Sequence, residues 1–279
     1  PRASKPRLRL NDMDKDGADI HVVSINGSQP FYAADIKSAG KVARAGNEGV
    51  AEWVARHPDR FVGLGMVPFQ APKAAIRELE YAMNGLGLRG VNILTNINGR
   101  ELGDPKFEPF WARAEALGAT VLLHPLGFTQ TQRLQKFFLS NTVGQPLEET
   151  LAMLSLIHEG VMERHPRLKV LVSHGGGYLP FYAGRSDSTF QLYPAMRGEA
   201  KRKPSDYIRR FYLDTCVFDR AMIEFLAAKY GANRIVLGTD YPYREWDALG
   251  MIRGSRALSW DAKEKILWKN AARLLNIKV

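Results

Sequence analysis

The chain alternates between two kinds of segment, and this alternation limits its fold more than any other feature. Seven short runs are rich in apolar residues, and helical patterns with polar faces separate most of them. The runs occupy residues 18–25, 61–69, 90–95, 120–125, 168–176, 211–218 and 234–240. Because the runs are continuously apolar rather than alternating, they are typical of parallel strands that are buried on both faces. We therefore predict an α/β fold built from β-α units.

Helical patterns lie between or after these runs, at residues 44–57, 72–86, 105–117, 147–165, 220–230 and 260–275. Two of them have clear start signals, since Asp104 stands before Pro105 and Asp219 stands before the fifth pattern. Gly118 and Gly231 follow the same two patterns and are expected to end them.

The β-α units follow one another without a change of composition, so we expect one domain over residues 1–279. Eight such units close a (β/α)8 TIM barrel, and the strands predicted here are one short of that number. Residues 1–25 are typical of the end of a helix followed by a strand. We therefore predict a TIM barrel whose first strand is missing from this chain.

The composition limits the cellular compartments and the binding partners that we expect for this protein. A single cysteine, Cys216, cannot form an internal disulfide, which favours a reducing, cytoplasmic compartment. No apolar run reaches the roughly 18 residues of a membrane span, so we expect no membrane partner. The net charge is +10, but the basic residues are spread along the chain and are not interleaved with stacking aromatics. We therefore expect no nucleic acid, and a small anionic substrate instead.

Polar side chains that can bind a metal or move protons stand at the ends of three apolar runs. His124 ends the run VLLHP, His174 follows LVS and precedes three glycines, and Asp240 ends the run IVLGTD. If the strands are parallel, their carboxyl ends share one face and these side chains converge there. Each has an ordinary alternative, respectively a hydrogen-bonded rim histidine, a glycine turn and a helix cap. The convergence of all three favours a functional site.

Two histidines and a carboxylate suit metal-assisted chemistry, because neutral imidazole and carboxylate both bind zinc-like ions. A histidine can also move protons, since its usual pKa is about 6.5. Three such groups leave little to spare for a separate base, so a metal site needs more ligands than this chain shows. Asp214 is a candidate for supporting the site. Arg185, in FYAGRSD, either grips a substrate carboxylate or is a surface arginine.

Several blocks of sequence, in this order and spacing, resemble one known family. They are HPDRFVGLGMVPFQAP, GLRGVNILTNINGRELGDPKFEPFWARAEALGATVLLHP, NTVGQPLEETLAMLSLIHEGVMERHPRLKVLVSHGGGYLPFYAGR, FYLDTCVFD, IVLGTDYPY and KILWKNAARLL. From near Leu10 to Ile277 the chain is similar to the amidohydrolase-related family (amidohydrolase 2) of 2-amino-3-carboxymuconate-6-semialdehyde decarboxylase. The resemblance implies a TIM barrel of the metal-dependent hydrolase type, with one divalent metal at the carboxyl ends of the strands.

The resemblance also implies roles for individual residues. His124 and Asp240 match metal ligands, and His174 matches the acid–base residue beside the metal, where it is a candidate third ligand. Zinc is the usual metal and manganese is the alternative. Arg185 matches an arginine that recognises a substrate carboxylate across the interface of a homodimer.

The expected activity is that of a metal-dependent nonoxidative decarboxylase, a carboxy-lyase that acts on a small unsaturated or aromatic carboxylic acid. His174 and Asp240 are its expected catalytic residues. A hydrolase or hydratase that uses the same site is the alternative. We expect the connection at residues 126–146 to cover the site, with Phe137 and Phe138 lining the pocket.

The sequence departs from the family at two places. The family's first strand carries a His-x-His pair that supplies two metal ligands, and this sequence contains no such pair. We expect the pair to lie upstream of Pro1, because an open parallel barrel exposes two strand edges. A catalytically silent barrel that has lost these ligands is the second alternative. The segment REWDALGM, after GTDYPY, also differs from the family's usual loop and leaves the substrate open.

Overall fold

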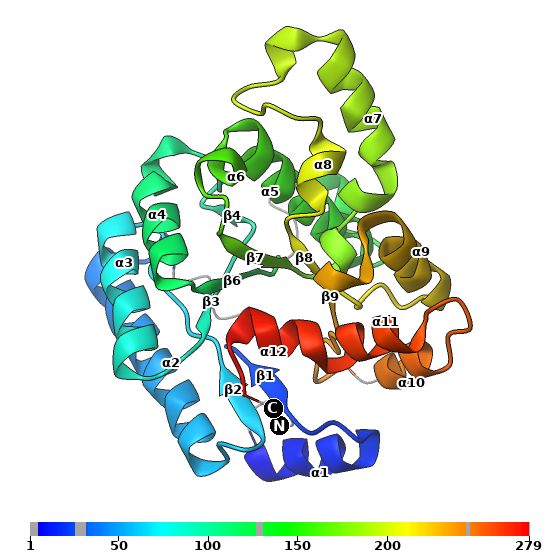
Figure 1. The fold of residues 1–279 in the computed structure, drawn as a ribbon. Coiled ribbons are helices and arrows are strands. Elements are labelled where there is room, and N and C mark those ends of the chain that lie inside the picture. Colours follow the sequence, from blue (N-terminus) through cyan, green and yellow to red (C-terminus); the bar gives the residue numbers. More distant parts are fainter. Residues whose placement is uncertain (1–4, 26–31, 127–130, 244–245, 279) are drawn as a thin grey trace.

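The computed structural model describes residues 5–25, 32–126, 131–243 and 246–278. Within this part of the chain, seven parallel strands each fall inside one of the predicted runs (Figure 1). They are β1 (His21–Val23), β2 (Phe61–Gly63), β3 (Gly90–Ile93), β6 (Thr120–Leu123), β7 (Lys169–Val172), β8 (Tyr212–Asp214) and β9 (Ile235–Val236). A small antiparallel pair, β4 (Asn96–Ile97) and β5 (Arg100–Glu101), follows β3. The predicted α/β fold with parallel strands is confirmed.

The parallel strands follow one another in chain order around the molecule. β1 pairs with β2, and β3, β6, β7, β8 and β9 form one sheet in that order. A bridge between Gly65 and Val91 links the two sheets. Among the described residues no strand pairs with the outer edge of β1 or of β9, so the described barrel has an open seam there. The eighth strand stays a prediction.

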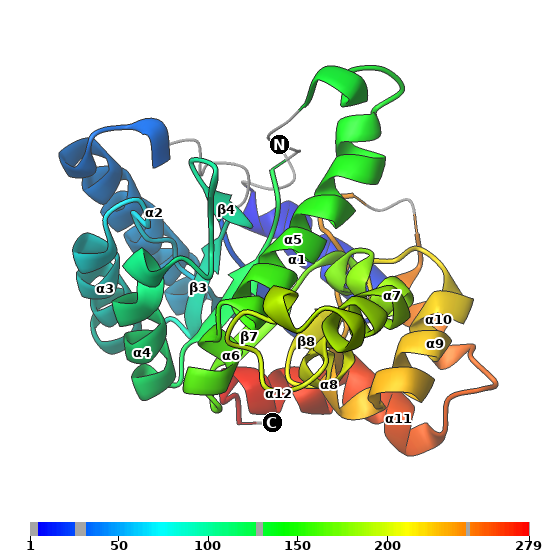
Figure 2. The same ribbon diagram turned by 90° about the horizontal axis from the view of Figure 1, so that it is seen from above.

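Helices surround the strands on the outside (Figures 1 and 2). They are α1 (Pro6–Asp16), α2 (Ile36–Arg56), α3 (Pro72–Glu80), α4 (Glu108–Leu117), α5 (Gln145–His158), α6 (Val161–Arg164), α7 (Leu179–Leu192), α8 (Pro204–Ile208), α9 (Arg220–Tyr230), α10 (Ala248–Arg253), α11 (Trp260–Glu264) and α12 (Asn270–Leu275). Figure 2 shows α2, α3 and α4 along one side and α9, α10 and α11 along the other. None of these helices is both long enough and apolar enough to cross a membrane.

The predicted helix signals act as expected. The carboxylate of Asp104 accepts a hydrogen bond from the backbone N–H of Lys106, and that of Asp219 accepts one from Ala221. Gly118 ends α4 with a φ of 63°, in the left-handed region that a glycine enters without steric cost. The segment after the three glycines contains the 14-residue helix α7, which is not among the helical patterns predicted above. Its many polar and small residues give it no clear apolar face, so periodicity does not reveal it.

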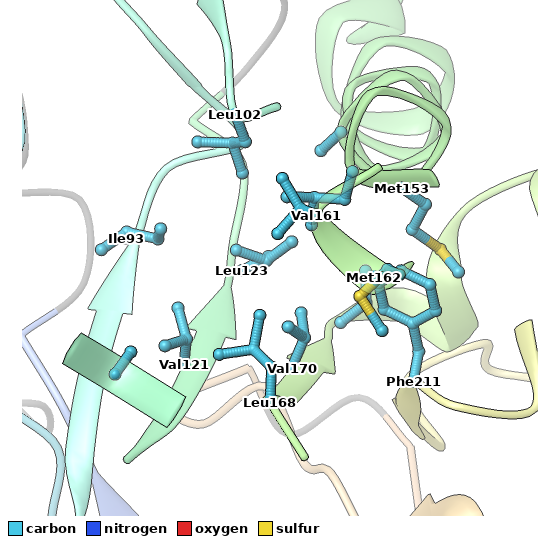
Figure 3. Packing of buried hydrophobic residues seen from close by; sticks show 14 of the residues in the cluster. Ile93, Leu102, Val121, Leu123, Met153, Val161, Met162, Leu168, Val170 and Phe211 are labelled. Atoms are coloured by element: carbon cyan, nitrogen blue, oxygen red, sulfur yellow. The ribbon is translucent and has the colours of Figure 1, made fainter. Parts of the chain in front are cut away.

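Alternate residues of the central strands point to opposite sides of the barrel wall. Val121 and Leu123 of β6 and Val170 of β7 are fully buried under the outer helices, beside Met162 (Figure 3). The intervening residues point inwards instead: Leu122 and Leu171 line an internal cavity. Each buried side chain of this kind stabilises the fold by about 1.5–3 kcal/mol. The outer layer therefore holds the strands whose tips carry the polar residues.

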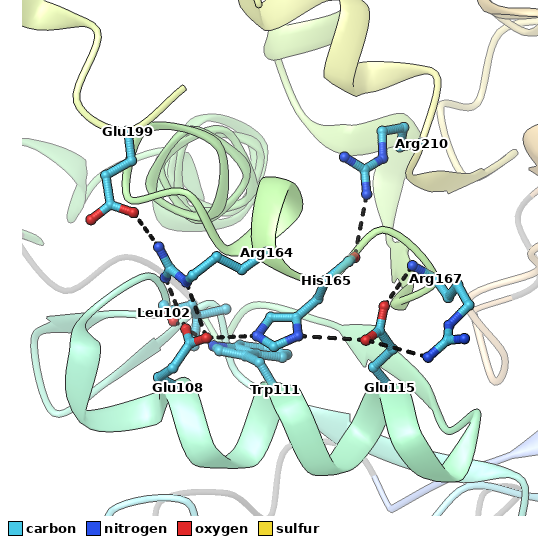
Figure 4. A network of polar contacts seen from close by, with 9 residues as sticks. All are labelled: Leu102, Glu108, Trp111, Glu115, Arg164, His165, Arg167, Glu199 and Arg210. Atoms are coloured by element: carbon cyan, nitrogen blue, oxygen red, sulfur yellow. Dashed lines mark hydrogen bonds and ion pairs between the residues drawn. The ribbon is translucent and has the colours of Figure 1, made fainter. Parts of the chain in front are cut away.

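A polar network ties α4 to the segment that leads into β7 (Figure 4). Glu108 accepts two hydrogen bonds from the guanidinium of Arg164, at 3.0 and 2.8 Å. The ring of His165 lies between Glu108, at 2.7 Å, and Glu115, at 3.7 Å. This network fixes the start of β7, and His174 follows the end of the same strand.

Candidate metal centre

Three predicted site residues lie together at the carboxyl ends of the strands. His124 directly follows β6, His174 lies two residues beyond β7, and Asp240 lies four residues beyond β9. His124 Nε2 is 3.7 Å from Asp240 Oδ1, and His174 Nε2 is 4.0 Å from Asp240 Oδ2. One ligand atom from each residue falls within 4.8 Å of the others. Only 12–22% of each side chain is exposed, so solvent reaches the group but does not surround it.

The backbone at two of these residues is in a sparsely populated conformation. His174 and Asp240 both have a φ of 48°, which lies in the left-handed region. This conformation is energetically unfavourable for any residue that carries a Cβ atom. Gly177 follows His174 with a φ of 64°, and a Cβ atom there would lie 2.1 Å from the carbonyl oxygen of Pro146. The glycines let the chain turn sharply against α5. Strain of this kind clusters at functional sites.

Hydrogen bonds orient both imidazole rings towards the carboxylate. His124 Nδ1 lies 2.9 Å from the carbonyl oxygen of Pro125, which can only accept, so Nδ1 carries the hydrogen. The lone pair of His124 Nε2 therefore faces Asp240, and this buried atom has no hydrogen-bond partner among the described residues. His174 Nδ1 lies 2.6 Å from Glu149 Oε1, which likewise turns its Nε2 towards Asp240. Imidazole Nε2 atoms facing a carboxylate fit a divalent ion.

The charges of the site shift its pKa values in opposite directions. Burial by itself lowers the pKa of His174, but the adjacent carboxylates of Glu149, Asp214 and Asp240 outweigh it and raise that pKa to about 9. Burial raises the pKa of Asp240, but the neighbouring imidazole of His124, at 3.7 Å, and the charge of His174 lower it overall. At neutral pH the site therefore favours a protonated His174 next to an ionised Asp240.

Asp214 supports the turn that carries His174. It lies at the end of β8 with 9% of its surface exposed, and burial raises the pKa of its carboxyl group. One carboxylate oxygen accepts hydrogen bonds from the backbone N–H groups of Gly175 and Cys216, each at 3.0 Å. Asp214 thus links the glycine turn to the neighbouring strand.

The three residues open into a cavity of about 1160 Å³. It extends from the carboxyl ends of the strands, between Leu122 and Leu171, to Leu274 of α12. Phe138 lies at the edge of this cavity, and its side chain is 74% exposed.

Two other predicted residues do not line this cavity. Phe137 is 87% exposed and points to solvent. Arg185 is also exposed, since α7 carries it away from the mouth of the cavity. Neither Phe137 nor Arg185 therefore reaches the cavity of its own chain, and their roles at the site stay predictions.

A guanidinium that sequence reasoning missed lines the same cavity. Arg9 of α1 donates from Nε to His21 Nδ1 at 3.2 Å, and its guanidinium carbon lies 4.3 Å from the ring centroid of Tyr241. Burial lowers the pKa of Arg9 to about 10, so it stays protonated at neutral pH. Among the described residues no carboxylate forms an ion pair with it. Such a half-buried cation is suited to bind an anion.

A weak signal for Arg9 was present in the sequence. Arg9 stands three and four residues before Asp12 and Met13, which are both buried, so the three residues share one face of α1. A basic residue on the buried face of a helix is unusual. Arg9 does not stand out in the sequence, however, because the neighbouring residues are also basic.

Comparisons with known proteins agree with this geometry. An amidohydrolase family model matches residues 1–277. A 2-amino-3-carboxymuconate-6-semialdehyde decarboxylase of Dictyostelium discoideum is 34% identical over 275 residues, which cover 98% of this chain and 77% of the relative. The solved 5-carboxyvanillate decarboxylase of Sphingomonas paucimobilis superposes with a TM-score of 0.91 at 29% identity, over 97% of this chain and 82% of that chain. A dihydroxybenzoic acid decarboxylase of Polaromonas sp., solved with bound manganese and the inhibitor 2-nitroresorcinol, gives 0.87 at 29% identity, over 98% and 86%. The chain belongs to the amidohydrolase family.

Proposed function

We propose that this protein is a metal-dependent nonoxidative decarboxylase of a small aromatic or unsaturated carboxylic acid. The observation that carries the proposal is the convergence of His124, His174 and Asp240 in a cavity that also exposes the guanidinium of Arg9. The relatives described above are named as decarboxylases, and two of them act on substituted benzoic acids.

In this proposal His124, through Nε2, and Asp240, through its carboxylate, hold the metal. His174 Nε2 is a third donor only when its ring is neutral. When bound, a divalent ion acts as a Lewis acid that draws electron density from oxygens of the substrate. Imidazole favours zinc, whereas carboxylate also suits manganese, the metal bound in the Polaromonas relative. We therefore propose zinc or manganese.

His174 supplies the proton that replaces the carboxyl group. Its Nε2–H points into the cavity, because Glu149 holds Nδ1. The proton moves to the carbon that bears the carboxylate; the bond from that carbon to the carboxylate then breaks, and its electron pair restores the conjugated system. Carbon dioxide leaves, and the neutral His174 regains a proton from water. A positioned general acid of this kind contributes about 10²–10⁴-fold to the rate.

Arg9 holds an anionic group of the substrate. The guanidinium faces the cavity with its terminal nitrogens free of acidic partners among the described residues, so it can form two parallel hydrogen bonds to a carboxylate. The apolar inner side chains, such as Leu122 and Leu171, are suited to contact the carbon skeleton.

We further propose that the active protein is a homodimer in which Arg185 enters the cavity of the partner. Arg185 is exposed on α7 and does not line the cavity of its own chain. Tyr182 and Leu192, on the same helix, are 67% and 68% exposed, which suits a helix that packs on another subunit. We also propose a cytoplasmic location, supported by the single cysteine; cell fractionation tests it.

The test of the activity combines metal analysis with product analysis. The purified protein is expected to contain zinc or manganese and to release carbon dioxide from a carboxylated muconate or a hydroxybenzoic acid. His174→Ala should retain the fold and lose this activity. A metal-bearing wild-type protein that instead forms a hydrated or ring-opened acid is a hydratase or hydrolase, and one that binds no metal is a silent barrel.

A further inference from the structure

Glu149, on α5, is in direct contact with His174, the proposed general acid. Glu149 is completely buried, and its Oε1 lies 2.6 Å from His174 Nδ1 and 2.6 Å from Ser173 Oγ. Glu149 does not line the cavity, so it acts on a bound molecule only through His174.

Burying the carboxyl group of Glu149 costs folding free energy, and the contacts of this group with the rest of the fold compensate that cost only in part. Burial raises the pKa of its carboxyl group, and its Oε2 has no hydrogen-bond partner among the described residues. Ser173 Oγ also lies 2.9 Å from the carbonyl oxygen of Leu123 and has a single hydrogen, so it donates to only one of the two acceptors at a time. A buried carboxylate is tolerated when a cationic or strongly hydrogen-bonding partner compensates it. His174 is placed to be that partner.

We propose that Glu149 is a positioning residue that holds the hydrogen of His174 on Nδ1 and so directs Nε2 at the cavity. The inference rests on the proposed function in one respect, the role of His174 as the acid. Without Glu149 the ring can rotate, or can carry its single hydrogen on Nε2 when neutral, because the partner of one ring nitrogen decides the state of the other. The proton that reaches the substrate would then no longer be aimed at the reacting carbon.

The neighbouring residue provides a matched control. Glu148 is also buried on α5, with 3% of its surface exposed, but it accepts hydrogen bonds from Thr95 Oγ1 at 2.9 Å and Asn96 Nδ2 at 2.8 Å. It does not contact His174 in any hydrogen bond or ion pair among the described residues. Its replacement removes a buried carboxylate from the same turn of helix without touching the proposed site.

The experiment compares Glu149→Met, Glu149→Gln and Glu148→Gln in the metal-loaded protein. Methionine keeps the volume of Glu149 and removes the acceptor, whereas glutamine keeps an acceptor oxygen at the same reach. We expect Glu149→Met to lower kcat about 10–100-fold with KM unchanged, at an unaltered or higher melting temperature. Glu149→Gln should restore part of kcat. Glu148→Gln should lower the melting temperature and leave kcat unchanged.

A second readout does not depend on activity. In the protein with its histidines labelled with ¹⁵N, the wild-type and Glu149→Gln spectra should show His174 with its hydrogen on Nδ1, at an alkaline pH where the ring is neutral. Glu149→Met should move that hydrogen to Nε2. Unchanged His174 resonances in Glu149→Met, or a full kcat in that variant, overturn the proposal. If no aromatic or unsaturated acid is decarboxylated by the wild type, the proposed function fails, but the spectra still decide the role of Glu149.

Discussion

At the scale of single residues, Asp240 combines a carboxylate that faces two histidines with an unfavourable backbone conformation. Its carboxylate faces the Nε2 atoms of both His124 and His174, and its backbone adopts a left-handed conformation to do so. The neighbouring imidazole of His124 and the charge of His174 lower its pKa overall, so it stays ionised at neutral pH, as a metal ligand must.

Replacing this carboxylate should therefore remove the metal. We expect Asp240→Asn to lose most of its bound zinc or manganese and to lower kcat/KM roughly 10³-fold, which corresponds to about 4 kcal/mol of transition-state stabilisation. Elemental analysis and steady-state kinetics measure the two effects. The control is Asp247→Asn, which weakens the cap of α10 through its bond to Gly250 N–H and leaves the cavity intact. A fully loaded Asp240→Asn enzyme would contradict the assignment.

Arg9 should act on binding rather than on the chemical step. Its guanidinium is half-buried, faces the cavity and has no acidic partner among the described residues. Hydrogen bonds to a charged group contribute about 1.5–3 kcal/mol, so Arg9→Met should raise KM about 10–100-fold and change kcat little. Arg7→Met changes an exposed arginine of the same helix and should leave both constants as they are. A fall in kcat alone would argue against a role in substrate binding.

At the scale of the elements, the ion-pair network between α4 and the start of β7 gives the fold a pH dependence. The two hydrogen bonds from Arg164, opposed by burial and aided by the hydrogen bond with His165, lower the pKa of Glu108 (Figure 4). A lowered pKa in the folded state means that the ionised Glu108 stabilises the fold fully above the usual glutamate pKa. This stabilisation disappears as the pH falls through the lowered value.

Glu108→Gln tests this contribution. We expect the free energy of unfolding of the variant to be about 1–2 kcal/mol lower than that of the wild type at pH 7, because Arg164 and His165 lose their charged acceptor. The difference should shrink in strongly acidic solution, where Glu108 is protonated in both states. Urea unfolding at several pH values measures it. Glu52→Gln is the control: its pair with Arg56 is more than 60% exposed, so it should cost less than about 0.5 kcal/mol. An equal loss at every pH would refute the electrostatic origin.

At the scale of the whole molecule, the placement of Arg185 on an exposed helix leads to a test by mixing subunits. His174→Ala and Arg185→Ala should each be inactive. If Arg185 serves the partner's cavity, a mixed dimer contains one site with both residues, so random mixing should restore about a quarter of the wild-type activity. Activity assays after joint refolding measure this, and sedimentation reports the size of the particle. Mixed dimers that stay inactive, or a monomeric wild type, would exclude the arrangement.

Much of this architecture followed from local pattern. Continuous apolar runs placed the parallel strands, Asp104 and Asp219 marked helix starts, and polar residues at strand ends marked His124, His174 and Asp240. These signals are local because burial on both faces, capping and strand polarity each depend on residues adjacent in the chain.

The remaining features depended on segments that are distant in the sequence. Arg9 reaches the site only because α1 packs beside the loop that carries Tyr241, and Glu149 meets His174 only because the glycine turn presses against α5. Phe137 turned out to point to solvent, and the direction of a side chain in a loop is set by backbone angles that composition does not reveal.

The sequence by itself determined the β-α order of this protein, the face of the strands that bears the site and three of its residues. Only the tertiary structure decided which charges meet there: the carboxylate that orients His174, the guanidinium in the cavity and the outward position of Arg185. The physical reason is that periodicity and capping act within a few residues of one another. Hydrogen bonds and ion pairs between buried groups instead form wherever packing brings distant elements within about 3 Å.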